Sequence, residues 1–214
     1  MRPSIHLAPI DLATLRRLWK PLRDSYANAH LYRDNRIRIH RAFSWLERAS
    51  ALPDAALDER YLAQWAGFAA LHSRWDAARG QPVGESAAIT AFVRQLFATD
   101  HDGVMAGTME RERTLVTSMF TDRYLARHCE EVDVKALLER RRFDRIARHL
   151  LERCALVHAQ LARGGATYGS RENRTVLKRS SMVLEHLSVA AIQVVTNHGY
   201  ADDWGDLCWP PARG

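Results

Sequence analysis

Cysteine is scarce in this sequence and follows no recognisable spacing. The 214 residues include three cysteines, Cys129, Cys154 and Cys208, and no two of them form a Cys-x-x-Cys pair. This number and spacing argue against a disulfide framework and against a zinc knuckle. We therefore expect a reduced, cytoplasmic protein without a structural metal.

Long apolar runs are also missing. The most apolar stretch, residues 180–197, is interrupted by Glu185, His186 and Gln193. It is too short and too polar to cross a bilayer, so it predicts a buried helix and no membrane association. Residues 1–11 contain no extended apolar segment of the kind found in a signal peptide, and we expect none.

Lysine is nearly absent, whereas arginine is abundant. The chain has 3 lysines and 28 arginines, with a formal net charge of +6 and a pI of about 9.6. A GC-rich genome explains such a bias without any function. Arginine also binds phosphate better than lysine does, because its planar guanidinium can donate two parallel hydrogen bonds to phosphate oxygens. The charge thus permits a nucleic-acid partner without requiring one.

The apolar residues predict an all-α fold class. They make up 47% of the chain, enough for a buried core, and the length fits one domain or a core with an extension. They recur at helical spacing, and no strand-like alternation is evident. The expected helices are 11–29, 34 to the break at Pro53, 58–75, 86–98, one or two within 101–131 broken near Thr121, 133–163 and 175–198, with a loop at 76–85.

Two glycines mark the end of the longest expected helix. Gly164 and Gly165 follow residues 133–163, and glycine suits a left-handed helix C-cap because it has no Cβ. The next helix should return alongside and give a long antiparallel C-terminal hairpin. We expect Trp204 and Trp209 of the following tail to dock on this bundle.

The hairpin sequence LLERCALVHAQLARGGATYGSRENR, residues 150–174, resembles the closing hairpin of the HEPN superfamily (higher eukaryotes and prokaryotes nucleotide-binding domains). In one bacterial branch that hairpin has the general form vFdRLYVLRNQLVHGGATwnS..NR, which matches here without a gap. The agreeing positions are Arg153, Gln160, Leu161, Gly164, Gly165, Ala166, Thr167, Ser170, Asn173 and Arg174.

Three shorter stretches resemble other segments of that branch in the same order: ERYLAQWAGFAALH, DRYLARH and DDWGDLCWP. The likeness covers about residues 58–210. We therefore expect a HEPN-like helical bundle at 58–214, preceded by an N-terminal helical extension at 1–57.

The resemblance implies a bundle, often dimeric, that binds or cleaves RNA without a metal or cofactor. The family's active pair is an Arg and a His, spaced Arg-x4–6-His, at the end of this helix. On the gapless match His158 occupies the Arg position and Arg163 the His position, so the two residue types are exchanged. The asparagine usual beside the family's Arg falls on Ala159, and another helix asparagine falls on Ala69.

Both residue types still suit RNA cleavage through attack of the ribose 2′-OH. Histidine titrates near neutral pH, so we expect His158 to transfer protons. Arginine stays charged, so we expect Arg163 to stabilise the phosphate. The family context further implies an RNA partner, a homodimer or another protein partner, and a role in defence or toxin–antitoxin systems.

A second pair, Arg153 and His158, also satisfies Arg-x4–6-His. Seven Arg–His pairs in this sequence fit that loose spacing, so the spacing alone identifies nothing. Use of this pair would need an insertion before the glycines, and Arg153 already matches the arginine of FdRLY. The gapless match is preferred.

Other arginines are candidates for binding nucleic acid. One helical face carries three of them and forms a potential phosphate track, although Glu139 and Glu152 nearby also suit a solvated face. The candidates are Arg153 and Arg174 in the hairpin and Arg141, Arg145 and Arg148 on that face.

Two rival functions remain open. The first is a non-catalytic HEPN-like module, such as a scaffold or an antitoxin-like partner, in which the exchanged pair is a relic. The second is a metal phosphohydrolase of the HD type, built on adjacent His101 and Asp102 with His72 before them and Asp122 or Asp144 after.

Overall fold

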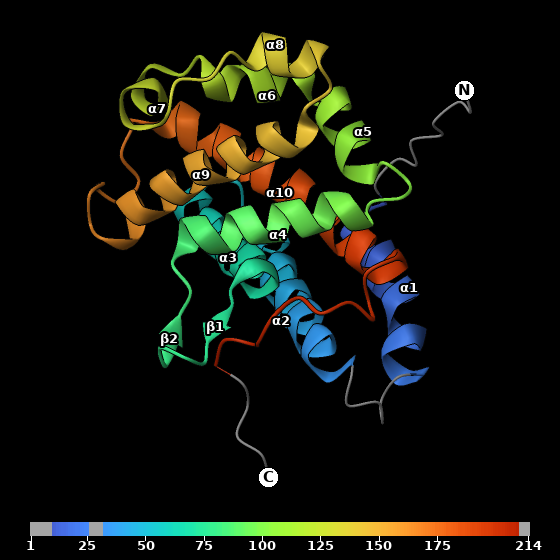
Figure 1. Ribbon diagram of the computed structural model, residues 1–214. Coiled ribbons are helices and arrows are strands. Elements are labelled where there is room, and N and C mark those ends of the chain that lie inside the picture. Colours follow the sequence, from blue (N-terminus) through green and yellow to red (C-terminus); the bar gives the residue numbers. More distant parts are fainter. Residues whose placement is uncertain (1–9, 26–31, 210–214) are drawn as a thin grey trace.

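The computed structural model describes residues 10–25 and 32–209. Within these ranges the chain forms helices and one two-stranded antiparallel sheet, which confirms the all-α fold class (Figure 1). The elements are α1 (Leu12–Ser25), α2 (Arg33–Ser50), α3 (Leu57–His72), β1 (Trp75–Asp76), β2 (Gln81–Pro82), α4 (Glu85–Thr99), α5 (Val104–Arg111), α6 (Arg113–Phe120), α7 (Arg123–His128), α8 (Val134–Glu139), α9 (Phe143–Ala162) and α10 (Arg174–Asn197).

Helix α10 is the centre of the bundle. It packs on α3, α5, α6 and α9, and α1 and α4 also reach it (Figure 1). Its buried residues include the polar Ser180, Ser188 and Gln193. A helix enclosed on most sides must be apolar nearly all round, and this explains the apolar stretch at 180–197. No described helix has the length and apolar character needed to cross a membrane.

The predicted C-terminal hairpin is present. Helix α9 ends at Ala162, and Gly164 has φ +70°, in the left-handed region that glycine adopts without cost. The amide of Gly165 donates to the carbonyl of Gln160 at 2.7 Å, and the amide of Gly164 donates to that of Leu161 at 3.2 Å. This pair of bonds is a Schellman cap, so the two glycines end the helix as expected.

Three predicted elements differ from the structure. The helix expected at 133–163 is divided into α8 and α9, because Arg141 between them has φ +52°, which no α-helix accommodates. Residues 101–131 form three helices, with the break near Thr121 confirmed between α6 and α7. The loop at 76–85 contains the short β1–β2 pairing.

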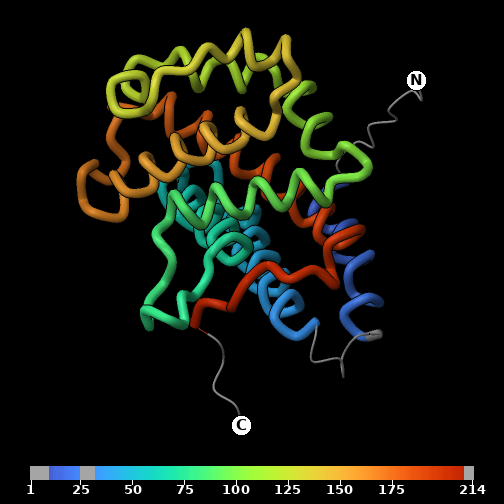
Figure 2. The backbone as a smooth tube through the Cα atoms, viewed as in Figure 1, coloured from blue at the N-terminus to red at the C-terminus, as the bar shows by residue number. Residues whose placement is uncertain are grey.

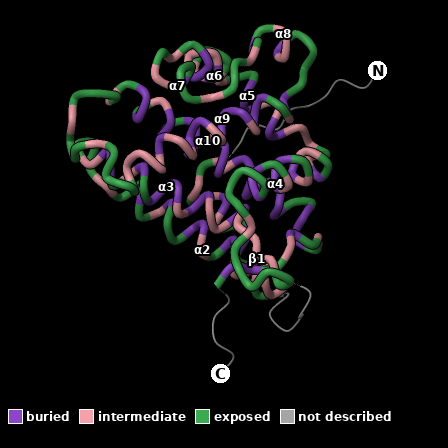
Figure 3. The backbone as a smooth tube through the Cα atoms, turned by 60° about the vertical axis from the view of Figure 1, so that its left-hand side comes forward, coloured by how far each residue is buried: buried purple, intermediate pink, exposed green. Residues whose placement is uncertain are grey.

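The N-terminal helices join the same core. Helix α2 packs along α3, and buried positions alternate with exposed ones on both helices (Figure 3). The buried residues Ile39 and Phe43 of α2 lie in the cluster that holds Tyr61 and Trp65. Helix α1 ends at Ser25; the rest of the helix expected at 11–29, and residues 1–9 of the predicted extension, lie outside the described residues.

The C-terminal segment after α10 crosses to the β1–β2 hairpin (Figure 2). Buried Arg38 of α2 fixes it there, donating to the carbonyls of Gly205 and Asp206. Trp204 is 3% exposed, as expected for a docked residue. Trp209 also contacts the bundle, because its ring meets that of Trp75 with centroids 5.4 Å apart, but 68% of the residue stays exposed.

Candidate nucleic-acid site

The predicted pair lies at the C-terminal end of α9, where α3 and α4 converge on it. His158 is half-buried, and its ring stacks on Trp65 of α3 with centroids 4.9 Å apart and planes 14° from parallel. Arg163 is the exposed C-cap residue of α9. The stacking restricts the imidazole to one orientation, whereas the guanidinium is exposed to solvent.

The electrostatics link His158 to Arg163. Burial lowers the pKa of His158, and the positive charge of Arg163 lowers it further. Glu85, the first residue of α4, is part of the same group. Partial burial raises the pKa of its carboxyl, while the Trp65 indole and the Arg163 charge act in the opposite direction. A neutral imidazole, a cation and a carboxylate therefore lie together around Trp65.

Two of the predicted nucleic-acid ligands have internal partners. Arg153 is 2% exposed; it donates to the carbonyls of His149 and Glu130 and lies over the Phe120 ring at 4.3 Å. Its guanidinium is part of the protein interior. These contacts join α9 to the segment after α7.

Arg174 is the first residue of α10 and also faces inward. It forms an ion pair of 2.5 Å with Asp58 of α3, whose residue is 6% exposed. A buried carboxylate needs a charged partner, so this arginine has a structural task at the end of the hairpin loop.

The other three predicted arginines gather at a groove between α4 and the start of α9. The groove encloses about 640 Å³, and a fourth arginine, Arg94 of α4, also lines it. Arg94 and Arg145 are exposed, and neither has an ion pair or hydrogen bond with a described side chain. Arg141 lies before the helix, over the Phe143 ring at 5.3 Å. The predicted arginine face of α9 thus forms one side of a groove, and Arg94 of α4 lies on the other side.

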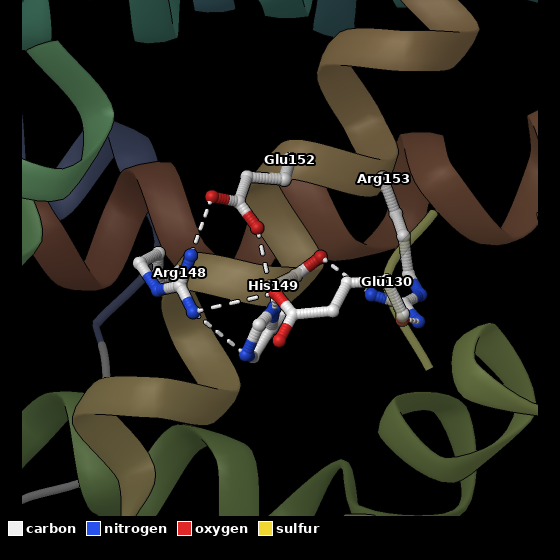
Figure 4. Close-up of polar contacts among 5 residues, drawn as sticks. All are labelled: Glu130, Arg148, His149, Glu152 and Arg153. Carbon is white, nitrogen blue, oxygen red and sulfur yellow. Dashed lines mark hydrogen bonds and ion pairs between the residues drawn. The ribbon is translucent and has the colours of Figure 1, made fainter. Parts of the chain in front are cut away.

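Arg148 is held by a polar cluster at the edge of this groove (Figure 4). It donates to Glu152 at 2.8 Å and lies 2.9 Å from Nε2 of the buried His149. Nε2 must accept from a guanidinium, so Nδ1 carries the ring proton and faces Glu152 at 3.2 Å and Glu130 at 3.8 Å. Arg148 is therefore anchored, in contrast to Arg94 and Arg145.

The residues considered for an HD-type metal site do not come together. Asp102 pairs with His198 at 2.7 Å, and Asp144 pairs with Arg142. Asp122 caps α7, and His72 is buried on α3. Among the described residues no group of three or more His, Cys, Asp or Glu side chains is placed to hold a metal ion.

Arg94, Glu85 and the role of Trp65 were not evident from the sequence. Arg94 and Glu85 lie on α4, which runs antiparallel to α9 and packs against it (Figure 1). Their own neighbours in sequence give no signal, because Arg145 is 51 residues from Arg94 and Arg163 is 78 residues from Glu85. Only the packing of α4 on α9 reveals them.

No family model, curated protein or solved structure matches this chain.

Proposed function

We propose that this protein is a HEPN-like, RNA-associated endoribonuclease that needs no metal, with His158 as the proton-transfer group and Arg163 as the phosphate stabiliser. The observation that carries the proposal is the placement of a neutral, ring-stacked histidine within electrostatic range of an exposed arginine. The resemblance of residues 150–174 to the HEPN hairpin supplies the expectation of RNA.

The chemistry follows from the state of each side chain. With its pKa below the usual range, His158 is neutral at pH 7 and accepts the proton of the ribose 2′-OH. The 2′-oxygen then bonds to phosphorus, the bond from phosphorus to the 5′-oxygen breaks, and the leaving oxygen takes a proton from water, to which His158 returns the proton it accepted. Arg163 balances the charge that develops on the phosphate. The products are a 2′,3′-cyclic phosphate and a 5′-hydroxyl.

The seam between α4 and α9 gives the RNA a path to this pair. From Arg148 to Arg163 the helix rises by about 22 Å, and the arginine groove lies at one end of the seam with the pair at the other. Phosphates bound by Arg94 and Arg145 would direct the strand along α9 towards His158.

A cleavage assay in EDTA tests the proposal. The purified protein is incubated with single-stranded and structured RNA, beside His158→Ala and Arg163→Ala. We expect cyclic-phosphate ends from the unaltered protein and a rate at least about 100-fold lower in each variant, since proton transfer and stabilisation of the phosphate charge each contribute on that scale. Arg163→Lys should retain part of the rate because it keeps the charge.

The chain offers matched controls. His40 also stacks on a tryptophan, Trp19, at 6.3 Å, but lies on α2. Arg171 is exposed in the same loop as Arg163. His40→Ala and Arg171→Ala should cleave normally. Cleavage that persists in both His158→Ala and Arg163→Ala would reject the assignment of these residues.

A non-catalytic RNA-binding module is the second candidate. The observation that favours it is the groove with Arg94 and Arg145, which form no ion pair within 4 Å among the described residues and could bind phosphate independently of His158. RNA binding without cleavage over a wide set of RNAs, unchanged in Arg163→Lys, would favour this module over the enzyme.

A further inference from the structure

A cavity of about 470 Å³ lies between α2, α3, the start of α4 and the C-terminal segment. Small side chains on α3 and α4 leave the space: Ala66, Ala69, Ala70 and Ala88. Two large aromatic side chains border it, Trp45 and Trp209, and they are 48% and 68% exposed. Exposed tryptophans at a cavity provide surfaces on which a flat ring stacks.

His72 gives the cavity a directional polar group. The residue is 1% exposed, and its Nδ1 lies 3.0 Å from the carbonyl of Phe68. A carbonyl only accepts, so Nδ1 carries the ring proton and Nε2 is an acceptor. Nε2 has no hydrogen-bond partner among the described residues, although His72 lines the cavity. Burial holds the imidazole neutral by lowering its pKa to about 4.

Glu85 connects the cavity with the catalytic pair. Its carboxyl lines the same cavity and is within electrostatic range of Arg163. Arg41 also lines the cavity, but its guanidinium donates to the carbonyls of Cys208 and Trp209. Among the other lining groups, the His72 imidazole nitrogen and the Glu85 carboxylate accept, while the Ser73 hydroxyl and the tryptophan indoles can donate.

We infer that this cavity binds a nucleobase of the RNA strand, next to the phosphate held by Arg163. The inference rests on the proposed function. Each of the four bases presents an N–H to the His72 acceptor, either the amino group of adenine, cytosine and guanine or the ring N3–H of uracil, so this contact does not select among them. The tryptophans provide stacking for any base.

Direct binding measurements test the pocket separately from cleavage. Calorimetry with AMP, CMP, GMP and UMP, and with the trinucleotides ApApA, CpCpC and UpUpU, gives affinities without turnover in His158→Ala. We expect all four mononucleotides to bind, and each trinucleotide to bind more tightly than its mononucleotide. Trp45→Ala should weaken all of them about tenfold or more, since it removes a stacking surface.

His72→Phe keeps a ring and removes the acceptor, so it should weaken the binding of every nucleotide about tenfold while stacking persists. Leu18→Ala removes a side chain that is 56% exposed on α1 and should change nothing. Equal affinities of the His72→Phe, Trp45→Ala and unaltered proteins would overturn the inference, as would mononucleotides that bind while trinucleotides do not. If binding shows the expected pattern but no RNA is cleaved, only the proposed enzyme falls.

Discussion

The ion pair of Asp58 and Arg174 shows that a residue of the HEPN-like hairpin sequence can stabilise the fold instead of binding RNA. Arg174 is among the hairpin positions that agree with the HEPN form, but it bonds to a carboxylate on α3 rather than facing solvent. Tyr168 of the same loop donates to Glu59, one residue further along α3. Both contacts pin the loop after α9 against α3, where His158 stacks on Trp65. Arg174 and Tyr168 therefore help to position the loop that holds Arg163 near His158.

Arg174→Ala should lower the free energy of unfolding by about 2–3 kcal/mol, because Asp58 is left buried without its charged partner. Urea denaturation measures the change. Arg171→Ala, three residues away and exposed, should change it by less than about 0.5 kcal/mol. Unchanged stability with a loss of RNA affinity would instead make Arg174 a nucleic-acid ligand.

At the scale of elements, the antiparallel packing of α4 on α9 decides what the arginines can do. Arg141 and Arg145 come from the chain entering α9, and Arg94 comes from the opposite side of the groove. Arginines on both sides of a groove can reach two phosphates of one strand, which a single helical face cannot do as readily.

The double variant Arg94→Ala/Arg145→Ala should make RNA binding less dependent on salt. Loss of two phosphate contacts lowers the slope of log affinity against log salt by about 1.4 for a single strand. Fluorescence anisotropy between low and high salt measures the slope. Arg17→Ala/Arg48→Ala removes the same charge from exposed positions on α1 and α2 and should leave the slope nearly unchanged. Equal slopes in the two double variants would assign RNA binding elsewhere.

At the scale of the whole molecule, burial of histidines couples stability to pH. His72, His149 and His158 lie on α3 and α9, and burial is the largest cause that lowers the pKa of each. Arg38 and Arg74 act in the same direction on His72, and Arg148 does so on His149. The folded protein therefore takes up protons at lower pH than the unfolded chain does.

The sign of the effect follows from proton binding. Below about pH 6.5 the unfolded chain binds protons that the folded state excludes, so stability is present above that pH and declines as pH falls towards 4. Urea denaturation at pH 7, 6 and 5 measures the decline. For His72 alone the loss approaches about 3 kcal/mol at pH 4. The free energy of unfolding of His72→Phe should decline less steeply with falling pH than that of the unaltered protein. An equal decline would show that His72 is not the cause.

The sequence by itself determined the fold class, the closing hairpin and the end of α9. These depend on local rules: apolar spacing builds the helices, and Gly164 adopts the positive φ that ends one. The positive φ of Arg141, which separates α8 from α9, could not be predicted from the sequence, because arginine rarely adopts a positive φ without tertiary support.

Only the tertiary structure decided which residues meet at the candidate site. Trp65 beside His158, Arg94 opposite Arg145, and Asp58 beneath Arg174 are pairs whose members lie tens of residues apart in sequence. The burial of Arg153 and the exposure of Trp209 were decided in the same way, since residue type gives a tendency while the packing of neighbouring elements gives the outcome. Helical periodicity fixes which face of a helix is apolar, but the partner that covers that face is set by how the whole chain packs.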